Sequence, residues 1–181
     1  MRLWASRRPR RRAPDAGTAR GQGASVECAT VKVVIVGCGR VGSTLARKLV
    51  GEGHEVSVVD ELVASFGRLG EDFGGQMVVG SGIDEEVLRR AGIETADCFA
   101  SVTNGDNRNI MAAQIAQEVF HVKRVITRIY DPIRAEVYRE LGLQTICPTT
   151  IGAGILDEFF STGVNPAHSG RLVTGGAREQ G

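Results

Sequence analysis

From Val31 onwards, the chain alternates between two patterns of apolar residues. Short runs rich in valine and isoleucine are typical of buried strands, whereas apolar residues that recur every three or four positions indicate helices with one buried face. The short runs predict six strands, at Lys32–Val36, Glu55–Val59, Gln76–Val79, Cys98–Val102, Arg124–Thr127 and Gln144–Ile146. The longer segments predict helices at Val41–Val50, Leu62–Leu69, Asp84–Arg90, Asn107–Val119, Pro132–Leu141 and Ile151–Phe160.

Strands that alternate with helices in this way predict an α/β fold. In such a fold a doubly wound parallel sheet, here of six strands, carries helices on both faces. We expect a single domain of this kind over residues 31–149. Residues 150–160 are expected to form a C-terminal helix, whose Phe159-Phe160 end either packs on the domain or makes a dimer contact. Residues 161–181 are rich in glycine and polar residues, which predicts a flexible tail.

The first 30 residues differ in composition from the rest of the chain. They carry seven arginines and two acidic residues, without apolar periodicity, which predicts a disordered basic segment. Contact of Arg7–Arg12 with anionic lipid or nucleic acid is the alternative. A GTG start codon would read as valine at position 31 if translation were assigned an upstream start, so one hypothesis is that residues 1–30 come from an over-extended gene start. The remaining residues are mildly acidic and show no basic stripe, so we expect no nucleic-acid partner.

No run of the sequence reaches the ~18 apolar residues that a membrane-spanning helix needs. No apolar stretch follows the arginine pairs near the start, so we expect neither a signal peptide nor an anchor. The four cysteines are widely spaced and form no CxxC pair. This pattern is typical of a reducing cytoplasm and does not predict a metal site.

A glycine-rich loop, Gly37-Cys38-Gly39-Arg40-Val41-Gly42, follows the first predicted strand and opens the first helix. In this context the G-x-G-x-x-G spacing predicts a Rossmann-type dinucleotide-binding loop. The first glycine permits the tight turn, the second lets a pyrophosphate approach the backbone, and the third lets the helix pack closely on the sheet. Backbone N–H groups of the first helical turn would hold the phosphates. Arg40 either covers the pyrophosphate or is an ordinary surface residue.

Asp60 lies at the end of the second predicted strand, directly after Val59 and 18 residues beyond Gly42. An acidic residue at this distance is placed to accept hydrogen bonds from the ribose hydroxyls of an adenosine. Asp60 and its neighbour Glu61 would repel a 2′-phosphate, which favours NAD or ATP over NADP. The alternative is a simple glycine turn with a helix-capping aspartate.

Further polar groups follow the other strands: Gly80-Ser81-Gly82, Thr103-Asn104 and Arg128. Parallel strands end at one edge of a sheet, so we expect these groups to open on the same crevice. Asp106 and Asn109 fit a helix cap and the first turn behind it. Capping is also the alternative role for Thr103.

Taken together, these motifs resemble the regulatory nucleotide-binding domain of bacterial Trk and Ktr potassium uptake systems. The resemblance covers about 130 residues. It rests on VKVVIVGCGRVGSTLARKLVGEGHEVSVVD, GSGIDEEVLRRAGIETADCFASVTNGDNRNIMAAQIAQ and RVITRIYDP.

The resemblance implies a cytoplasmic, non-enzymatic subunit, peripheral at the inner face of the plasma membrane. Such a subunit binds NAD(H), ADP or ATP and gates a membrane potassium transporter, in an oligomer with identical or related regulatory subunits. It implies that Gly37 to Val41 hold the pyrophosphate and that Asp60 holds the ribose. Val102 and Thr103 would line the nucleotide, and Thr127 with Arg128 would form the far wall, where Arg128 is placed to sense phosphate charge.

The chain departs from the family pattern at two points. Many members have an aspartate where this chain has Ser81, which puts any contact made by that carboxylate in doubt. Family members usually continue into a second ligand-binding domain. We therefore expect either a truncated product or one half of a two-subunit arrangement.

Two other functions remain open. An NAD-dependent oxidoreductase would need a substrate region and usually a proton donor or acceptor. The three histidines, His54, His121 and His168, are not predicted at the carboxyl end of a strand. The second alternative is a nucleotide-sensing module for another ion transporter or a redox-sensing partner.

Overall fold

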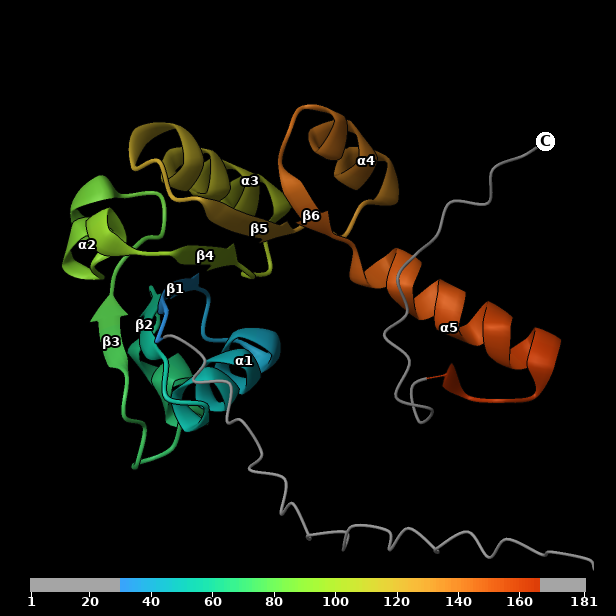
Figure 1. The fold of residues 1–181 in the computed structure, drawn as a ribbon, viewed down its shortest axis with the longest axis horizontal. Coiled ribbons are helices and arrows are strands. Elements are labelled where there is room, and N and C mark those ends of the chain that lie inside the picture. The colour runs from blue at the N-terminus through green and yellow to red at the C-terminus, as the bar shows by residue number, and fades with distance from the viewer. Residues whose placement is uncertain (1–29, 167–181) are drawn as a thin grey trace, which may run out of the picture.

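The computed structural model describes residues 30–166. Within this range the chain forms six strands, each followed by a helical segment (Figure 1). The strands are β1 (Lys32–Val36), β2 (Glu55–Asp60), β3 (Gln76–Val79), β4 (Cys98–Ser101), β5 (Arg124–Arg128) and β6 (Gln144–Ile146). The helices and helical turns are α1 (Arg40–Gly51), η1 (Val63–Arg68), α2 (Glu85–Arg90), η2 (Ile93–Thr95), α3 (Asp106–Gln114), η3 (Ile115–Val119), α4 (Pro132–Glu140) and α5 (Pro148–Thr162).

All paired strands run parallel, in the order β3-β2-β1-β4-β5-β6. The chain therefore leaves β1 in one direction across the sheet and returns to lie on the other side of it at β4. This order is that of the Rossmann fold, and the predicted α/β class is confirmed. The point where the order reverses lies between β1 and β4, which is where ligands of such sheets bind.

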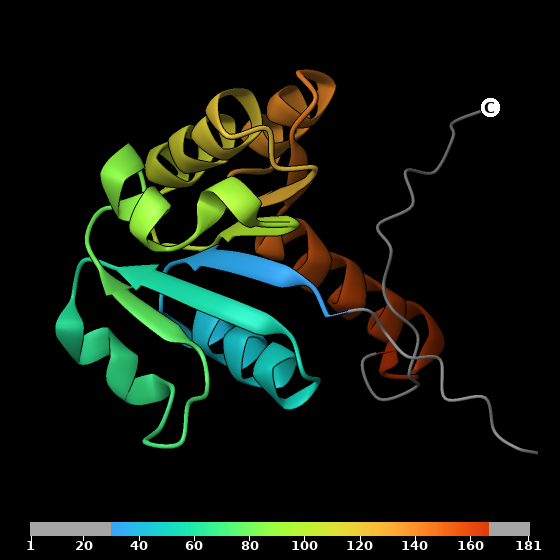
Figure 2. The same ribbon diagram turned by 60° about the vertical axis from the view of Figure 1, so that its left-hand side comes forward.

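Helices cover both faces of the sheet (Figure 2). On one face, α1 and η1 pack on the valines and isoleucine of β1 and β2 through residues such as Ala46 and Phe66. On the other face, α2, α3 and α4 bury Leu88, Ile110 and Ala135 against the sheet. Strands covered on both faces read as continuous apolar runs. This explains why the strands were predictable from the sequence.

The local sequence determines where several of the helices begin. The Asp84 carboxylate accepts a hydrogen bond of 2.9 Å from the Glu86 N–H, so Asp84 caps α2 as expected. Asp131 caps α4 in the same way, ahead of Pro132 in the first helical position. The predicted helix at Leu62–Leu69 is instead a 3-10 segment, Val63–Arg68. The predicted helix Asn107–Val119 begins at Asp106 and changes to π-helical bonding at Ile115–Val119.

The last helix, α5, extends past both ends of the predicted Ile151–Phe160 and projects away from the sheet (Figure 1). It contains no buried residue, and Phe160 is 80% exposed. Ser161 and Thr162, expected in the flexible tail, still belong to the helix, which ends at Gly163 with a φ of 71°. The rest of the predicted tail after residue 166 and the basic segment of residues 1–29 lie outside the described residues.

None of the helices between residues 30 and 166 combines the length and the apolar character needed to cross a membrane.

Candidate functional site

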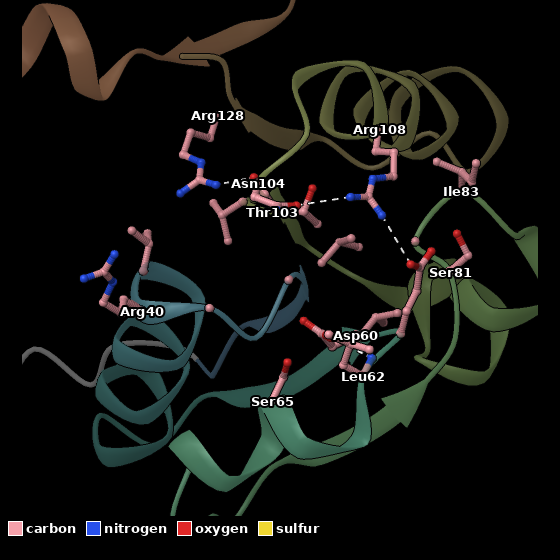
Figure 3. Close-up of a pocket in the computed structure, with 18 of the residues that line it drawn as sticks. Arg40, Asp60, Leu62, Ser65, Ser81, Ile83, Thr103, Asn104, Arg108 and Arg128 are labelled. Atoms are coloured by element: carbon pink, nitrogen blue, oxygen red, sulfur yellow. Dashed lines mark hydrogen bonds and ion pairs between the residues drawn. The ribbon is translucent and has the colours of Figure 1, made fainter.

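A pocket of about 690 Å³ opens at the carboxyl edge of the sheet (Figure 3). It lies above the ends of β1, β2 and β4, where the strand order reverses. Its lining residues are Val36, Gly37, Gly39, Arg40, Val41, Val59, Asp60, Glu61, Leu62, Ser65, Arg68, Gly80, Ser81, Gly82, Ile83, Val102, Thr103, Asn104, Arg108, Arg128 and Tyr130.

The glycine-rich loop forms the floor of this pocket. Gly37 has a φ of +106°, and a Cβ there would lie 2.9 Å from the Thr103 backbone nitrogen. A Cβ at Gly42 would lie 1.9 Å from the Gly37 carbonyl oxygen, so only glycine lets α1 pack this closely on the loop. At Gly39, in contrast, no atom lies within 4 Å of where a Cβ would be, apart from those of its two chain neighbours. The space beside Gly39 therefore belongs to the pocket itself.

The N-terminus of α1 points into the pocket behind this loop. Gly39 is the N-cap residue, and the first turn of α1 carries no acidic side chain. The first N–H groups of a helix have no partner within the helix, and they carry a partial positive charge. This end of α1 is therefore suited to an anionic group.

Asp60 is held at the end of β2 by two backbone donors. Its Oδ2 accepts a hydrogen bond of 2.7 Å from the Cys38 N–H, and its Oδ1 accepts one of 2.9 Å from the Leu62 N–H. The carboxylate is half-buried and lines the pocket. Each carboxylate oxygen has a further lone pair for a ligand hydroxyl. Figure 3 shows Asp60 on the opposite side of the pocket from Thr103 and Arg128.

A buried polar network holds the other side of the pocket. Asn109 is fully buried, and its Oδ1 accepts hydrogen bonds of 2.9 and 2.7 Å from the Thr103 N–H and hydroxyl. Its Nδ2 donates to the carbonyl oxygens of Thr103 and Arg128, both at 2.9 Å. The amide thus uses both donors and both acceptor positions. Asn109 joins the turn after β4 to the end of β5, a role that its expected place in the first helical turn did not reveal.

Arg128 lies against this network and is only 8% exposed. Its Nη2 donates to the Thr103 carbonyl oxygen, and its guanidinium carbon lies 4.5 Å from the centre of the Tyr130 ring. Its Nε is buried and has no hydrogen-bond partner among residues 30–166. A buried cation with an unused donor beside a pocket is suited to bind an anionic ligand.

Three of the predicted site residues do not line the pocket. Gly42 lies behind the loop, where it serves helix packing. The Cys38 side chain turns away and donates to the Ser65 carbonyl oxygen at 3.3 Å, and burial raises the pKa of this thiol. Thr127 is fully buried, with its hydroxyl 2.8 Å from that of Ser101. Side chains alternate along a strand, so Thr127 and Arg128 face opposite ways.

Several pocket residues were not predicted from the sequence: Leu62, Ser65, Arg68, Ile83, Arg108 and Tyr130. The sequence contained a signal for Arg108. It lies one helical turn after Asn104, so the two side chains are expected on the same side of the α3 N-terminus. Ser65 and Arg68 lie in η1, which was identified only as a helical segment.

Asp106 is the first residue of α3 rather than its cap, which is Gly105. The Asp106 carboxylate instead accepts hydrogen bonds from the N–H groups of Tyr130, at 3.0 Å, and Asp131, at 3.3 Å. It therefore fixes the turn between β5 and α4, next to the pocket.

Comparison with known proteins identifies relatives of this chain. A Trk system potassium uptake protein TrkA from Streptomyces coelicolor is 56% identical over 114 residues, which cover 63% of this chain and 51% of the relative. A TrkA homolog from Methanothermobacter thermautotrophicus is 29% identical over 130 residues, which cover 71% and 60%. The chain thus spans about half to three-fifths of the length of these two relatives.

Solved structures share the fold. The TrkA-N domain of inner membrane protein ybaL from Escherichia coli has a TM-score of 0.64 at 22% identity, over 72% of this chain and 96% of that one. The Kef C-terminal domain of Shewanella denitrificans in its AMP-bound form has a TM-score of 0.62 at 19% identity, over 76% and 86%. The GsuK channel bound to NAD has a TM-score of 0.58 at 24% identity, over 72% and 23%.

The family model of the TrkA-N domain matches residues 33–148, a range that contains β2 to β6, all of β1 except Lys32, and the whole of the pocket lining. The chain therefore belongs to the TrkA-N domain family.

Proposed function

We propose that this chain is a nucleotide-binding regulatory domain of a bacterial potassium uptake system. In this proposal it binds NAD(H), ADP or ATP and gates a membrane potassium transporter from the cytoplasmic side. One observation carries the proposal: the glycine loop, Asp60 and Arg128 all face the same pocket at the switch point of the sheet. The relatives named as potassium uptake proteins support the regulatory role. The structures of similar fold solved with AMP and NAD support an adenine nucleotide as the ligand.

The diphosphate of the ligand would lie on the N-terminus of α1. The open space beside Gly39 admits it, and the N–H groups of the first turn of α1 would donate to it. Arg40 lines the same part of the pocket and would add a charge-assisted hydrogen bond.

The adenosine ribose would lie beside Asp60. Both oxygens of this carboxylate are already fixed by backbone N–H groups, so the remaining lone pairs point in defined directions. A carboxylate so held does not need to be ordered when the ribose hydroxyls bind, which lowers the entropic cost of binding.

Arg128 and Thr103 would face the phosphate that is farther from the adenosine ribose. The buried Arg128 guanidinium with its unused Nε favours a ligand that carries negative charge there. ATP and ADP meet this condition, and so does the second phosphate of NAD(H). The proposal therefore includes both ATP or ADP and NAD(H), and titration distinguishes between them.

A contact path leads from this end of the pocket to α5. The Tyr130 ring lines the pocket beside Arg128, and the Tyr130 carbonyl oxygen accepts a hydrogen bond of 2.8 Å from the Thr149 hydroxyl in the first turn of α5. A ligand that shifts Arg128 would thereby bias the direction in which α5 leaves the domain. Such a bias performs work on a partner only if the ligand binds one arrangement more tightly than the other.

We further propose that α5 makes the contact with a second regulatory subunit. Its apolar side chains, Leu156, Phe159 and Phe160, are 57%, 43% and 80% exposed. Exposed aromatic residues gathered on one helix are typical of an interface. In the proposed function, the pocket senses a nucleotide and catalyses no reaction.

Calorimetric titration of the purified protein with NADH, NAD⁺, ATP and ADP tests the ligand. We expect at least one of them to bind, and Arg128→Gln to weaken ATP and ADP binding. Arg124→Gln is the matched control, because Arg124 is exposed at the opposite end of the same strand. Failure of all four nucleotides to bind the folded protein would refute the proposal. Co-purification of a potassium transporter from solubilised membranes, identified by mass spectrometry, tests the partner.

A further inference from the structure

An ion pair crosses the pocket between α3 and the end of β2. The Arg108 Nη1 lies 3.2 Å from Oε2 of Glu61, and its Nη2 donates to the Asn104 side-chain oxygen at 3.1 Å (Figure 3). Both partners of the ion pair line the pocket, and each side chain is 49% exposed. The Arg108 guanidinium therefore has partners on two sides, Glu61 and Asn104, which hold it in place.

Gly105 makes room for this arrangement. A Cβ at position 105 would lie 3.1 Å from the Arg108 Nε, closer than such contacts usually are. The Arg108 side chain can therefore fold back along the N-terminus of α3 and reach Glu61 on the neighbouring strand.

The pair lies next to the proposed ribose site, because Glu61 directly follows Asp60. A 2′-phosphate on the ribose would bring negative charge to this position. It would meet two carboxylates and one guanidinium that is already paired. Arginine binds carboxylate and phosphate oxygens with the same fork of donors, so Glu61 and a 2′-phosphate are alternative partners for Arg108.

We propose that Arg108 and Glu61 are specificity-determining residues for the 2′ position of the nucleotide. Glu61 excludes a 2′-phosphate in two ways: by its own charge, and by occupying the one arginine that reaches across from α3 to this position. This inference rests on the proposed function. It goes beyond repulsion by acidic residues. It predicts that the pocket already contains an arginine able to bind a 2′-phosphate, Arg108, and that Glu61 blocks this arginine.

The ion pair itself is weak enough to exchange partners. Half-exposed pairs contribute little to stability, so the loss of the Glu61 charge would release Arg108 without unfolding the domain. Arg68 also lines the pocket, from η1, and is a competing source of positive charge.

The experiment compares ligands that differ only in the 2′-phosphate. Dissociation constants are measured by calorimetry for NADPH against NADH, and for adenosine 2′,5′-bisphosphate against AMP. We expect Glu61→Gln to raise the affinity for the 2′-phosphorylated ligand relative to its partner by about tenfold, which corresponds to about 1.4 kcal/mol. The double variant Glu61→Gln/Arg108→Gln should lose most of this gain.

Glu85→Gln is the matched control. It also removes a carboxylate partner from an arginine, Arg89 at 2.8 Å, which keeps Glu86 and Glu94 at 3.6 and 3.5 Å, and these residues lie outside the pocket. We expect it to leave both affinity ratios unchanged.

Equal ratios in Glu61→Gln and in the double variant would overturn the role of Arg108. The same conclusion follows if Glu61→Gln/Arg68→Gln loses the gain while Glu61→Gln/Arg108→Gln keeps it. These outcomes differ from failure of the proposed function, in which none of the four ligands binds any folded variant and this inference falls with it.

Discussion

The backbone N–H of Cys38 donates a hydrogen bond of 2.7 Å to the carboxylate of Asp60, which ties the turn after β1 to the end of β2. The second carboxylate oxygen accepts from the Leu62 N–H, at the start of the next turn. Asp60 therefore shapes the pocket before any ligand is present. In the proposed function, the same side chain fixes the loop and binds the ribose.

Replacement of Asp60 should therefore affect both stability and binding. Asp60→Ala leaves two N–H groups without their charged acceptor, so we expect the free energy of unfolding to fall by about 2 kcal/mol. Urea denaturation with and without ADP measures both effects, and the stabilisation by ADP should be largely lost. Asp72→Ala, at an exposed carboxylate in the turn before β3, is the control. Equal stability of the two variants would contradict the structural role of Asp60.

Two of the loop glycines, Gly39 and Gly42, should respond differently to substitution. Gly42→Ala places a Cβ 1.9 Å from the Gly37 carbonyl oxygen, and overpacking of this kind should lower the free energy of unfolding by about 3 kcal/mol. Gly39→Ala meets open space, and its φ of −75° suits alanine, so stability should be retained. Its methyl group would instead occupy the proposed diphosphate position. We expect Gly39→Ala to unfold like wild type in urea and to bind nucleotide at least tenfold more weakly. Nucleotide binding at full strength would place the diphosphate elsewhere.

Asn109 should be one of the most sensitive polar residues of the domain. Asn109→Ala removes four hydrogen bonds inside the protein and leaves the N–H of Thr103 and two carbonyl oxygens without this partner. We expect a loss of about 3 kcal/mol in the free energy of unfolding, measured by urea denaturation. Asn107→Ala, at an exposed position of the same helix, should cost well under about 1 kcal/mol. Similar costs at the two positions would show that the network contributes nothing beyond surface contacts.

Cys38 predicts a dependence of stability on pH. Burial, and next the charge of Asp60, raise the pKa of this thiol above its ordinary value of 9.0. The folded protein therefore keeps a proton that the unfolded chain has already lost, so stability should fall as the pH rises above about 9. Cys38→Ala lacks this effect. The loss of stability that it causes near neutral pH should therefore shrink at about pH 10. Val56→Ala, at a buried residue that does not titrate, should cost the same at both pH values.

The exposed aromatic end of α5 predicts a change in association. If α5 joins two subunits as proposed, Phe160→Asp should shift the protein from dimer to monomer in sedimentation velocity experiments. The side chain is 80% exposed within one chain, so the free energy of unfolding of the monomer should hardly change. Asp157→Asn on the same helix serves as the control. A wild-type protein that stays monomeric at all accessible concentrations would contradict the proposed contact.

The sequence was informative where one local property decides the structure. The valine and isoleucine runs of the strands lie between two layers of helices, so apolar character alone identified them. The glycine loop and Asp60 were found because their spacing follows from the geometry of one turn and one strand. Arg108 and Tyr130 were missed, because their positions in the pocket depend on contacts between elements far apart in the chain. Thr127, expected at the far wall, is instead fully buried and does not line the pocket, because side chains alternate along β5.

The parallel arrangement of the strands also gives the sheet two edges that should differ in their tolerance to insertions. Every turn that lines the pocket follows a strand, whereas the turns at residues 52–54, 69–75 and 141–143 lead from a helix into a strand at the opposite edge. Insertions are best tolerated at surface turns far from the functional residues. A fluorescent reporter spliced into one of these three turns would therefore leave the pocket intact, which makes this domain a practical starting point for a genetically encoded nucleotide biosensor.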